Sequence, residues 1–532
     1  MNNIRIYFLA LFGFLLIASC DKGFEALNKN PFQSTETEIG PLFNTCVNSL
    51  RLGWNEQFYM HNETLYEITQ QAALSSITFQ NVSIGTEEVW NNYYITLAHI
   101  RELESRFEAW EGDPEAMNNV RAMVKILLAY KTFRLTDLFG DMPFFEAGRG
   151  FEDLAYARPK FDSQENIYLF LQDELKWAVE NINPIPNPVA DSGEPYYDLG
   201  NFETLLNGDL HRWIKFANSL RLRHAVRMYE KNPQTAGPII QEIMDNDLPL
   251  ITDNEDNVLM IPRLQQWLNE SVGWSFREHK KLRMGSNIWH QMSANDNTDG
   301  SGIFDPRCFV FFETNNASEW APFPQIPDDD TPPSGGIPYQ YHRDDNYIIK
   351  GQDNIYSPLN YYLVRDEHDV PEIIITAAEV HYLLAEIYLR GMAVPADEGE
   401  ADGEYTLGLA ESIEFWQAVA FNCQIWTNAQ EPLTYNEIFA ITNLPQMSIF
   451  TSTTKLELIY AQRWIDAFRQ PWEAYALIRR TGGQTPHEGD LKMHYRFAYP
   501  PGEVENNPDN WADQVAKMGE DSHLTKIWWM PD

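Results

Sequence analysis

The sequence has 532 residues, 44% of them hydrophobic, which is enough for a large core and for two to four domains of ordinary size. Acidic residues outnumber basic ones by 77 to 39, and the net charge is −38. A chain with this charge repels nucleic acids and anionic membrane surfaces, so we expect neither as a partner.

The first patterned segment is an apolar run over residues 6–17. Arg5, directly before it, is the only charged residue ahead of Asp21. A bilayer-spanning helix needs about 20 residues, whereas a secretory signal needs about 7 to 15 after a positive start. The run continues into "IASC", which resembles the lipobox of bacterial lipoproteins. This resemblance implies a signal peptide over residues 1–19 and a lipid anchor on Cys20. An ordinary cleaved signal followed by an incidental cysteine is the alternative.

Helical periodicity follows a polar, extended lead over residues 20–40. In 87–110, apolar residues recur at spacings of three and four and line one face: Val89, Tyr93, Leu97, Ile100 and Leu103. Further helices are predicted over 115–140, 163–183, 209–231, 372–391, 404–421 and 448–480. Several of them form pairs like those of tetratricopeptide repeats, although the consensus letters of that repeat are largely missing. The sequence therefore predicts a mainly α-helical fold built from helix pairs.

Residues 250–360 differ from the rest, because Pro, Gly, Asp and Asn cluster there between short apolar pieces. We expect a loop-rich insertion with short strands or helices between two helical halves. Loops that leave a rigid scaffold often carry recognition.

Several segments, taken in this order, resemble the SusD/RagB family of nutrient-binding outer-membrane lipoproteins. They are "FEALNKNPF" (24–32), "YKTFRLTDLFGDMPFFEA" (130–147), "ARPKFDSQENIYLFLQDEL" (157–175), "RWIKFANSLRLRHAVRM" (212–228), "FDPR" (304–307), "PEIIITAAEVHYLLAEIYLRG" (371–391), "LIYAQRWIDAFRQPWEAYALIRRTG" (458–482) and "FAYPPGEVENNP" (497–508). The resemblance covers nearly the whole chain after Cys20, and the lipobox agrees with it independently.

The resemblance implies a single helical domain over residues 41–532, with about four tetratricopeptide-like helix pairs and an irregular binding region. It also implies a place at the outer membrane, facing the cell exterior, and a SusC-like TonB-dependent transporter as partner. Members of the family pass oligosaccharides, or in some branches peptides, to that transporter, and they are not enzymes. A lipid-anchored glycoside hydrolase and a helical scaffold that binds only proteins remain as rival interpretations.

Some family segments also predict local structure. Gly140 and Pro143 end a helix, and Asp141 can bind backbone amides at the turn that follows. Arg463 and Asp466 stand three residues apart, which suits an ion pair on a helix surface.

Aromatic residues in loops are the first candidates for ligand binding, because sugar rings stack on aromatic faces. The candidates from the loop-rich insertion are Trp274, Trp289, Trp320 and Tyr339. The family often places ligand contacts near 75–90, which adds Phe79, Gln80 and Asn81, while Trp90 is expected to pack in the core. Each candidate taken alone also fits a core position, but we expect at least one of them to contact ligand.

The sequence predicts no cofactor and no metal. Aligning Gly300 with the glycine of a calcium-binding EF-hand loop puts Pro306 at the twelfth position, where a glutamate is required, so a polar turn is expected. A structural calcium in another oxygen cage stays open.

Common catalytic motifs do not occur. Cys46, Cys308 and Cys423 have no regular spacing, and either one disulfide or three buried thiols fits them.

Overall fold

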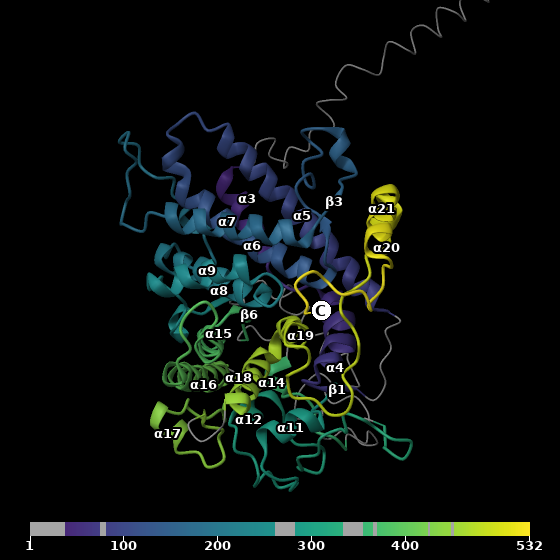
Figure 1. Cartoon of the computed structure of the whole chain (residues 1–532). Helices are drawn as coiled ribbons and strands as arrows, with labels where there is room; N and C mark the ends of the chain where they lie inside the picture. The colour runs from purple at the N-terminus through teal and green to yellow at the C-terminus, as the bar shows by residue number, and fades with distance from the viewer. Residues whose placement is uncertain are drawn as a thin grey trace, which may run out of the picture.

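The structure is a computed structural model that describes residues 38–74, 81–260, 282–333, 355–364, 370–423, 426–447 and 452–531. Within these ranges the chain is mainly helical, which confirms the predicted fold class. Figure 1 shows helices α3 and α5 to α9 in the upper part of the view, α15 to α18 below them, α4 in the lower half above β1, and α11 and α12 at the lower end.

Helices of the N-terminal half pack on their neighbours in chain order, α5 on α6, α6 on α7, α7 on α8 and α8 on α9. Their bounds are α3 Ile39–Asn48, η1 Glu56–Leu65, α4 Tyr66–Thr69, α5 Val82–Glu108, α6 Asn118–Phe139, α7 Gln164–Asn181, α8 Leu210–Met228 and α9 Pro233–Asp245. Element η1 is a π-helix. The predicted apolar face of α5 is buried along its whole length.

In the C-terminal half α15 packs on α16 and on α18, and α18 packs on α19. The bounds here are α11 Ser286–Met292, α12 Arg307–Phe311, α14 Tyr361–Val364, α15 Ala377–Arg390, α16 Glu398–Phe421, α17 Tyr435–Phe439, α18 Ser452–Asp466, α19 Pro471–Arg480, α20 Pro501–Asn506 and α21 Pro508–Met518. Short 3₁₀ helices lie at η3 Pro114–Met117, η4 Leu154–Ala157, η5 Gly200–Phe202, η6 Asn254–Asp256 and η8 Ala467–Arg469.

Three antiparallel ladders join distant parts of the described chain. They are β1 Ala73–Leu74 with β5 Leu282–Arg283, β2 Met142–Pro143 with β3 Phe161–Asp162, and β4 Val258–Met260 with β6 Glu372–Ile375. The ladder of β1 and β5 pairs Leu74 with Leu282 and so connects the N-terminal helices to the loop-rich region.

The predicted helices are confirmed, and two of them differ in detail from the prediction. Range 448–480 divides at η8, because Pro471 cannot continue a helix but fits the first turn of α19. Range 372–391 begins as strand β6, whose β-branched isoleucines favour an extended chain, before Thr376 caps α15 by accepting the Glu379 N–H at 3.1 Å.

The turn after α6 forms as predicted. Gly140 ends the helix with a φ of 81°, a conformation that favours glycine. Asp141 then accepts the backbone N–H of Gln164 at 2.8 Å, and Gln164 is the first residue of α7. Asp141 thus joins the end of one helix to the start of the next.

The loop-rich region contains the short helices and strands that were expected. Around Gly300, Asn295 and Asp299 accept the backbone N–H groups of Asn297 and Ser301 at 3.0 and 2.9 Å, which is the predicted polar turn. Among the described residues no group of three His, Cys, Asp or Glu side chains is arranged to hold a metal ion.

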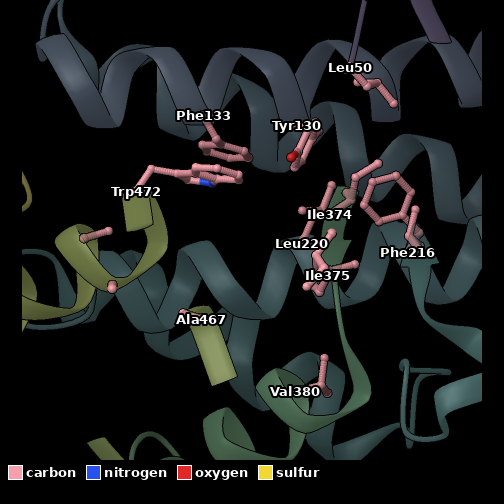
Figure 2. Close-up of a cluster of buried hydrophobic side chains, with 14 of the residues drawn as sticks. Leu50, Tyr130, Phe133, Phe216, Leu220, Ile374, Ile375, Val380, Ala467 and Trp472 are labelled. Carbon is pink, nitrogen blue, oxygen red and sulfur yellow. The ribbon is translucent and has the colours of Figure 1, made fainter. Parts of the chain in front are cut away.

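Apolar side chains from both halves form one buried cluster. Figure 2 shows part of it, with Tyr130 and Phe133 from α6, Phe216 and Leu220 from α8, Ile374 and Ile375 from β6, and Trp472 from α19. The three cysteines in the described part are also buried, and the thiols of Cys46 and Cys308 are free, so no disulfide joins the three.

A buried network of charges runs through the same helices. Arg227 of α8 pairs with Asp137 of α6 and with Glu473 of α19. Glu379 of α15 accepts hydrogen bonds from Arg223 at 2.8 Å and from Arg463 at 3.0 Å. Because these side chains lie out of water, each charge depends on its partner.

One sequence prediction is wrong here. Arg463 and Asp466 are both buried and do not form the predicted surface pair. Arg463 pairs with Glu379, while Asp466 accepts hydrogen bonds from Thr376 at 3.0 Å and from Ser412 at 2.6 Å. Spacing along a helix identifies local partners only, whereas here residues distant in the sequence provide the partners.

Candidate ligand-binding groove

A groove of about 620 Å³ lies along α5, within the range typical of small-molecule sites. Its lining comes from the start of η1, the exposed stripe of α5 and the start of α20: Asn55, Ser83, Ile84, Glu87, Glu88, Asn91, Asn92, Ile95 and Pro501. In Figure 1 helices α20 and α21 stand at the edge of the molecule beside α5. The groove offers amide, hydroxyl and carboxylate groups together with two exposed isoleucines.

The pattern of α5 explains this exposed stripe. Its inner face carries Val89, Trp90 and Tyr93, which are nearly inaccessible to solvent. The lining residues recur at spacings of three and four on the other side of the helix, so that their side chains share one face.

Gly85 brings η1 into contact with α5. A Cβ atom at this position would lie 2.9 Å from the Asn55 carbonyl oxygen and 3.0 Å from the Met60 nitrogen. Glu88 then accepts the Glu56 N–H at 2.8 Å and the Asn55 side-chain amide at 3.3 Å. Asn55 is thereby fixed at one end of the groove.

Three aromatic residues next to Asn55 form what we name the aromatic cluster: Trp54, Phe58 and Tyr59. The rings of Trp54 and Phe58 are stacked, with centroids 4.8 Å apart and planes 10° apart. Tyr59 meets both rings edge-on. All three side chains are half-buried, so the cluster presents part of its aromatic surface to solvent.

A buried ion pair supports the first turn of η1. Glu56 pairs with Arg134, whose guanidinium lies 4.3 Å from the ring centre of Trp472. Burial by itself would raise the pKa of Glu56, but the charge of Arg134 and a hydrogen bond from His61 outweigh it and lower the pKa to about 2. Glu56 is therefore ionised at neutral pH, and it anchors the turn beneath the aromatic cluster.

The third wall of the groove comes from the C-terminal part of the chain. The backbone N–H of Gly502 donates to Glu87 at 3.3 Å, and Tyr499 packs edge-on against Trp90 with centroids 5.8 Å apart. Trp90 is buried, as predicted. These contacts hold Pro501 against the stripe of α5.

The structure brings one sequence candidate close to this groove. Asn81 is exposed and directly precedes α5, and its side chain makes no capping hydrogen bond. Cys20, Phe79, Gln80, Trp274 and Tyr339 lie outside the described residues.

The other two candidates lie in the core. Trp289 is 1% exposed and Trp320 is 8% exposed, and their rings stack on each other with centroids 6.1 Å apart. The indole N–H of Trp289 also donates to Asp296 at 3.0 Å. Neither ring offers an open face in this structure, because Trp289 on α11 and Trp320 in the loop after α12 pack against each other.

Sequence reasoning missed the aromatic cluster and Asn91. The signal was present in "GWNEQFY" (53–59), where Trp54 and Phe58 stand four residues apart and Tyr59 adds a third ring. An aromatic pair at helical spacing usually indicates core, and only the structure shows that these rings are half-exposed beside polar side chains.

Comparisons with known proteins give one family model and several solved structures of similar fold. A family model described as "Starch-binding associating with outer membrane" matches residues 31–500. The structure resembles a chitin-binding protein at 23% identity and a TM-score of 0.70, covering 93% of this chain and 100% of that one. It resembles a SusD homologue from Parabacteroides distasonis at 20% identity and a TM-score of 0.67, covering 93% and 98%. A third match is an outer-membrane protein of Bacteroides vulgatus described as probably involved in nutrient binding, at 20% identity, a TM-score of 0.66, and coverage of 93% and 100%. No curated protein matches the sequence.

Proposed function

Because this chain belongs to the SusD-like family of starch-binding proteins associated with the outer membrane, we propose that it captures an oligosaccharide at the cell surface and delivers it to a SusC-like TonB-dependent transporter. Capture rests on stacking and hydrogen bonding, without cleavage of a bond. The observation that carries this proposal is the groove along α5, with amide side chains inside it and the aromatic cluster next to it.

The chemistry of the groove suits a sugar. Hydroxyl groups of a sugar both donate and accept hydrogen bonds, and the side-chain amides of Asn55, Asn91 and Asn92 do the same. The apolar face of a sugar ring carries C–H groups, which pack favourably against the electron-rich face of an aromatic ring. Trp54 is the residue we expect to provide that face.

Anchoring and delivery form the second part of the proposal. A lipid on Cys20 would hold the protein at the membrane. Among the described helices none is both long and apolar enough to cross a bilayer. Mass spectrometry of the N-terminal peptide tests the lipid directly, and Cys20→Ser is expected to release the protein from the membrane. Copurification of the lipidated protein with a TonB-dependent transporter tests the partner.

Ligand binding is tested with the chain from Asp21 to Asp532, which keeps every described residue. We would screen it by affinity electrophoresis and calorimetry against amylopectin, chitin oligomers, β-glucans, mannan and xylan, with peptide digests alongside. Chitin oligomers belong in the first panel because one matched structure is that of a chitin-binding protein.

The outcomes separate the possible functions. Binding of a polysaccharide without release of products supports the proposal, and binding of peptides alone would move it to the peptide-binding branch. Release of shortened products would show a glycoside hydrolase. Binding to neither class, together with stable association with another protein, would favour a scaffold.

A further inference from the structure

No described residue that lines the groove carries a positive charge. Of its nine described lining residues two are carboxylates, Glu87 and Glu88, and none is Lys, Arg or His. The part of α5 that lines the groove, residues 83–95, and helix α20, residues 501–506, together contain four acidic residues and no Lys or Arg.

Two cations that lie beneath η1 already have partners in the interior. Arg134 pairs with Glu56 beneath η1, and Lys131 donates to the Ser49 carbonyl at 2.8 Å. Both side chains are buried, so neither can pair with an anion bound in the groove.

Glu87 can meet a ligand directly. One of its carboxylate oxygens accepts the Gly502 N–H, and the other accepts no hydrogen bond from a described residue. Glu88 is fixed by Asn55 and Glu56, so its charge stays at the floor of the groove. Charges separated by less than a Debye length, about 8 Å at physiological ionic strength, interact with little screening.

From this charge pattern, and resting on the proposed function, we propose that the groove selects saccharides by charge. It accepts neutral chains, binds chains with free amino groups more tightly, and excludes chains with carboxylate or sulfate groups. An ammonium group can pair with the Glu87 oxygen that accepts no hydrogen bond from a described residue. A uronic acid would instead place a third carboxylate beside Glu87 and Glu88, with no cation among the described lining residues to balance it.

The test uses three forms of the neutral polysaccharide bound most tightly in the screen: the unmodified polymer, its C6-carboxylated derivative and its C6-amino derivative. We expect the amino form to bind more tightly than the neutral form at low salt, and the carboxylated form to bind at least about tenfold more weakly. In 1 M NaCl the three affinities should converge, because the effect is electrostatic.

A double variant, Glu87→Gln with Glu88→Gln, tests the two carboxylates themselves. Glutamine keeps an acceptor oxygen for the Glu56 N–H and removes the charge. We expect the affinity for the carboxylated derivative, relative to that for the neutral polymer, to rise about threefold to tenfold in the double variant. The matched control is Asp329→Asn with Asp330→Asn, which changes the net charge equally in an exposed loop and should leave all three affinities unchanged.

The results distinguish this inference from the function on which it rests. Carboxylated and neutral polymers that bind equally at low salt would overturn charge selection and leave glycan capture standing. The same holds if the control variant rescues binding as well as the groove variant does. Failure of every polysaccharide in the screen to bind would overturn both proposals.

Discussion

The buried network and the groove treat charge in opposite ways. In the network Glu473 contacts Arg227 and lies 3.8 Å from Arg223, and Glu386 is held by both guanidinium nitrogens of Arg480 at 2.7 and 2.6 Å. At the groove the carboxylates have backbone and amide partners and no cation among the described residues. The chain has 39 basic and 77 acidic residues. Because many of its arginines are buried, its surface is more acidic than the chain as a whole. In the interior charge therefore specifies the packing, and at the surface it determines which ligands can approach.

Acid should disrupt the network most strongly. Although burial opposes ionisation, arginine partners lower the pKa values of Glu386 and Glu473 from 4.5 to about 2. A carboxyl with a lowered pKa stabilises the fold above pH 4.5, and that stabilisation is lost as the pH falls through 4.5 toward 2. We expect the urea unfolding free energy to drop by several kcal/mol between about pH 7 and about pH 2.5. Glu386→Gln should lose less over the same interval, and an equal loss would contradict this assignment.

Removing one member of the network tests it at neutral pH. Glu473→Ala leaves Arg227 and Arg223 buried with one carboxylate fewer, which costs about 3–5 kcal/mol. Glu505, exposed on α20 near the groove, is the matched control, and Glu505→Ala should change stability by less than about 0.5 kcal/mol. Urea denaturation measures both. Similar losses at the two positions would remove the contrast between interior and surface.

Gly85→Ala tests the contact that positions Asn55. The new methyl group would press on the backbone of Asn55 and Met60, and we expect a loss of about 1–3 kcal/mol together with weaker ligand binding. At Gly403 in α16 an added methyl group would meet no atom within 4 Å, so Gly403→Ala should stabilise the protein by about 0.5–1 kcal/mol through helix propensity. Thermal unfolding of the two variants should shift in opposite directions.

The smallest effect on stability and a clear effect on binding are expected at the aromatic cluster. Trp54→Ala removes a half-exposed ring, and we expect affinity for the bound polysaccharide to fall about tenfold or more. Trp177 is also half-buried but lies on α7, away from the groove lining, and Trp177→Ala is the control. Calorimetry compares the two. Equal affinity in wild type and Trp54→Ala would exclude the cluster from the ligand site.

Sequence patterns were sufficient to predict the helices whose inner faces are apolar. They were not sufficient for η1, because Glu56, Gln57, His61 and Asn62 are buried there, and buried polar residues look like a surface in the sequence. The same limit explains the wrong prediction of an ion pair between Arg463 and Asp466, because their actual partners lie on other helices. Trp289 and Trp320 were predicted as ligand contacts but are buried. The direction of such side chains depends on contacts like the one between Trp289 and Asp296, which no local pattern encodes.

The hydrogen bond between Gly502 and Glu87 also has a consequence for biogenesis, because it joins residues 415 positions apart. Translation and export proceed from the N-terminus, so α5 emerges long before its third wall is made. Contacts between distant residues form late, since a long loop must close first. A nascent or truncated chain that lacks residues 501–502 would therefore hold an incomplete groove, without its third wall.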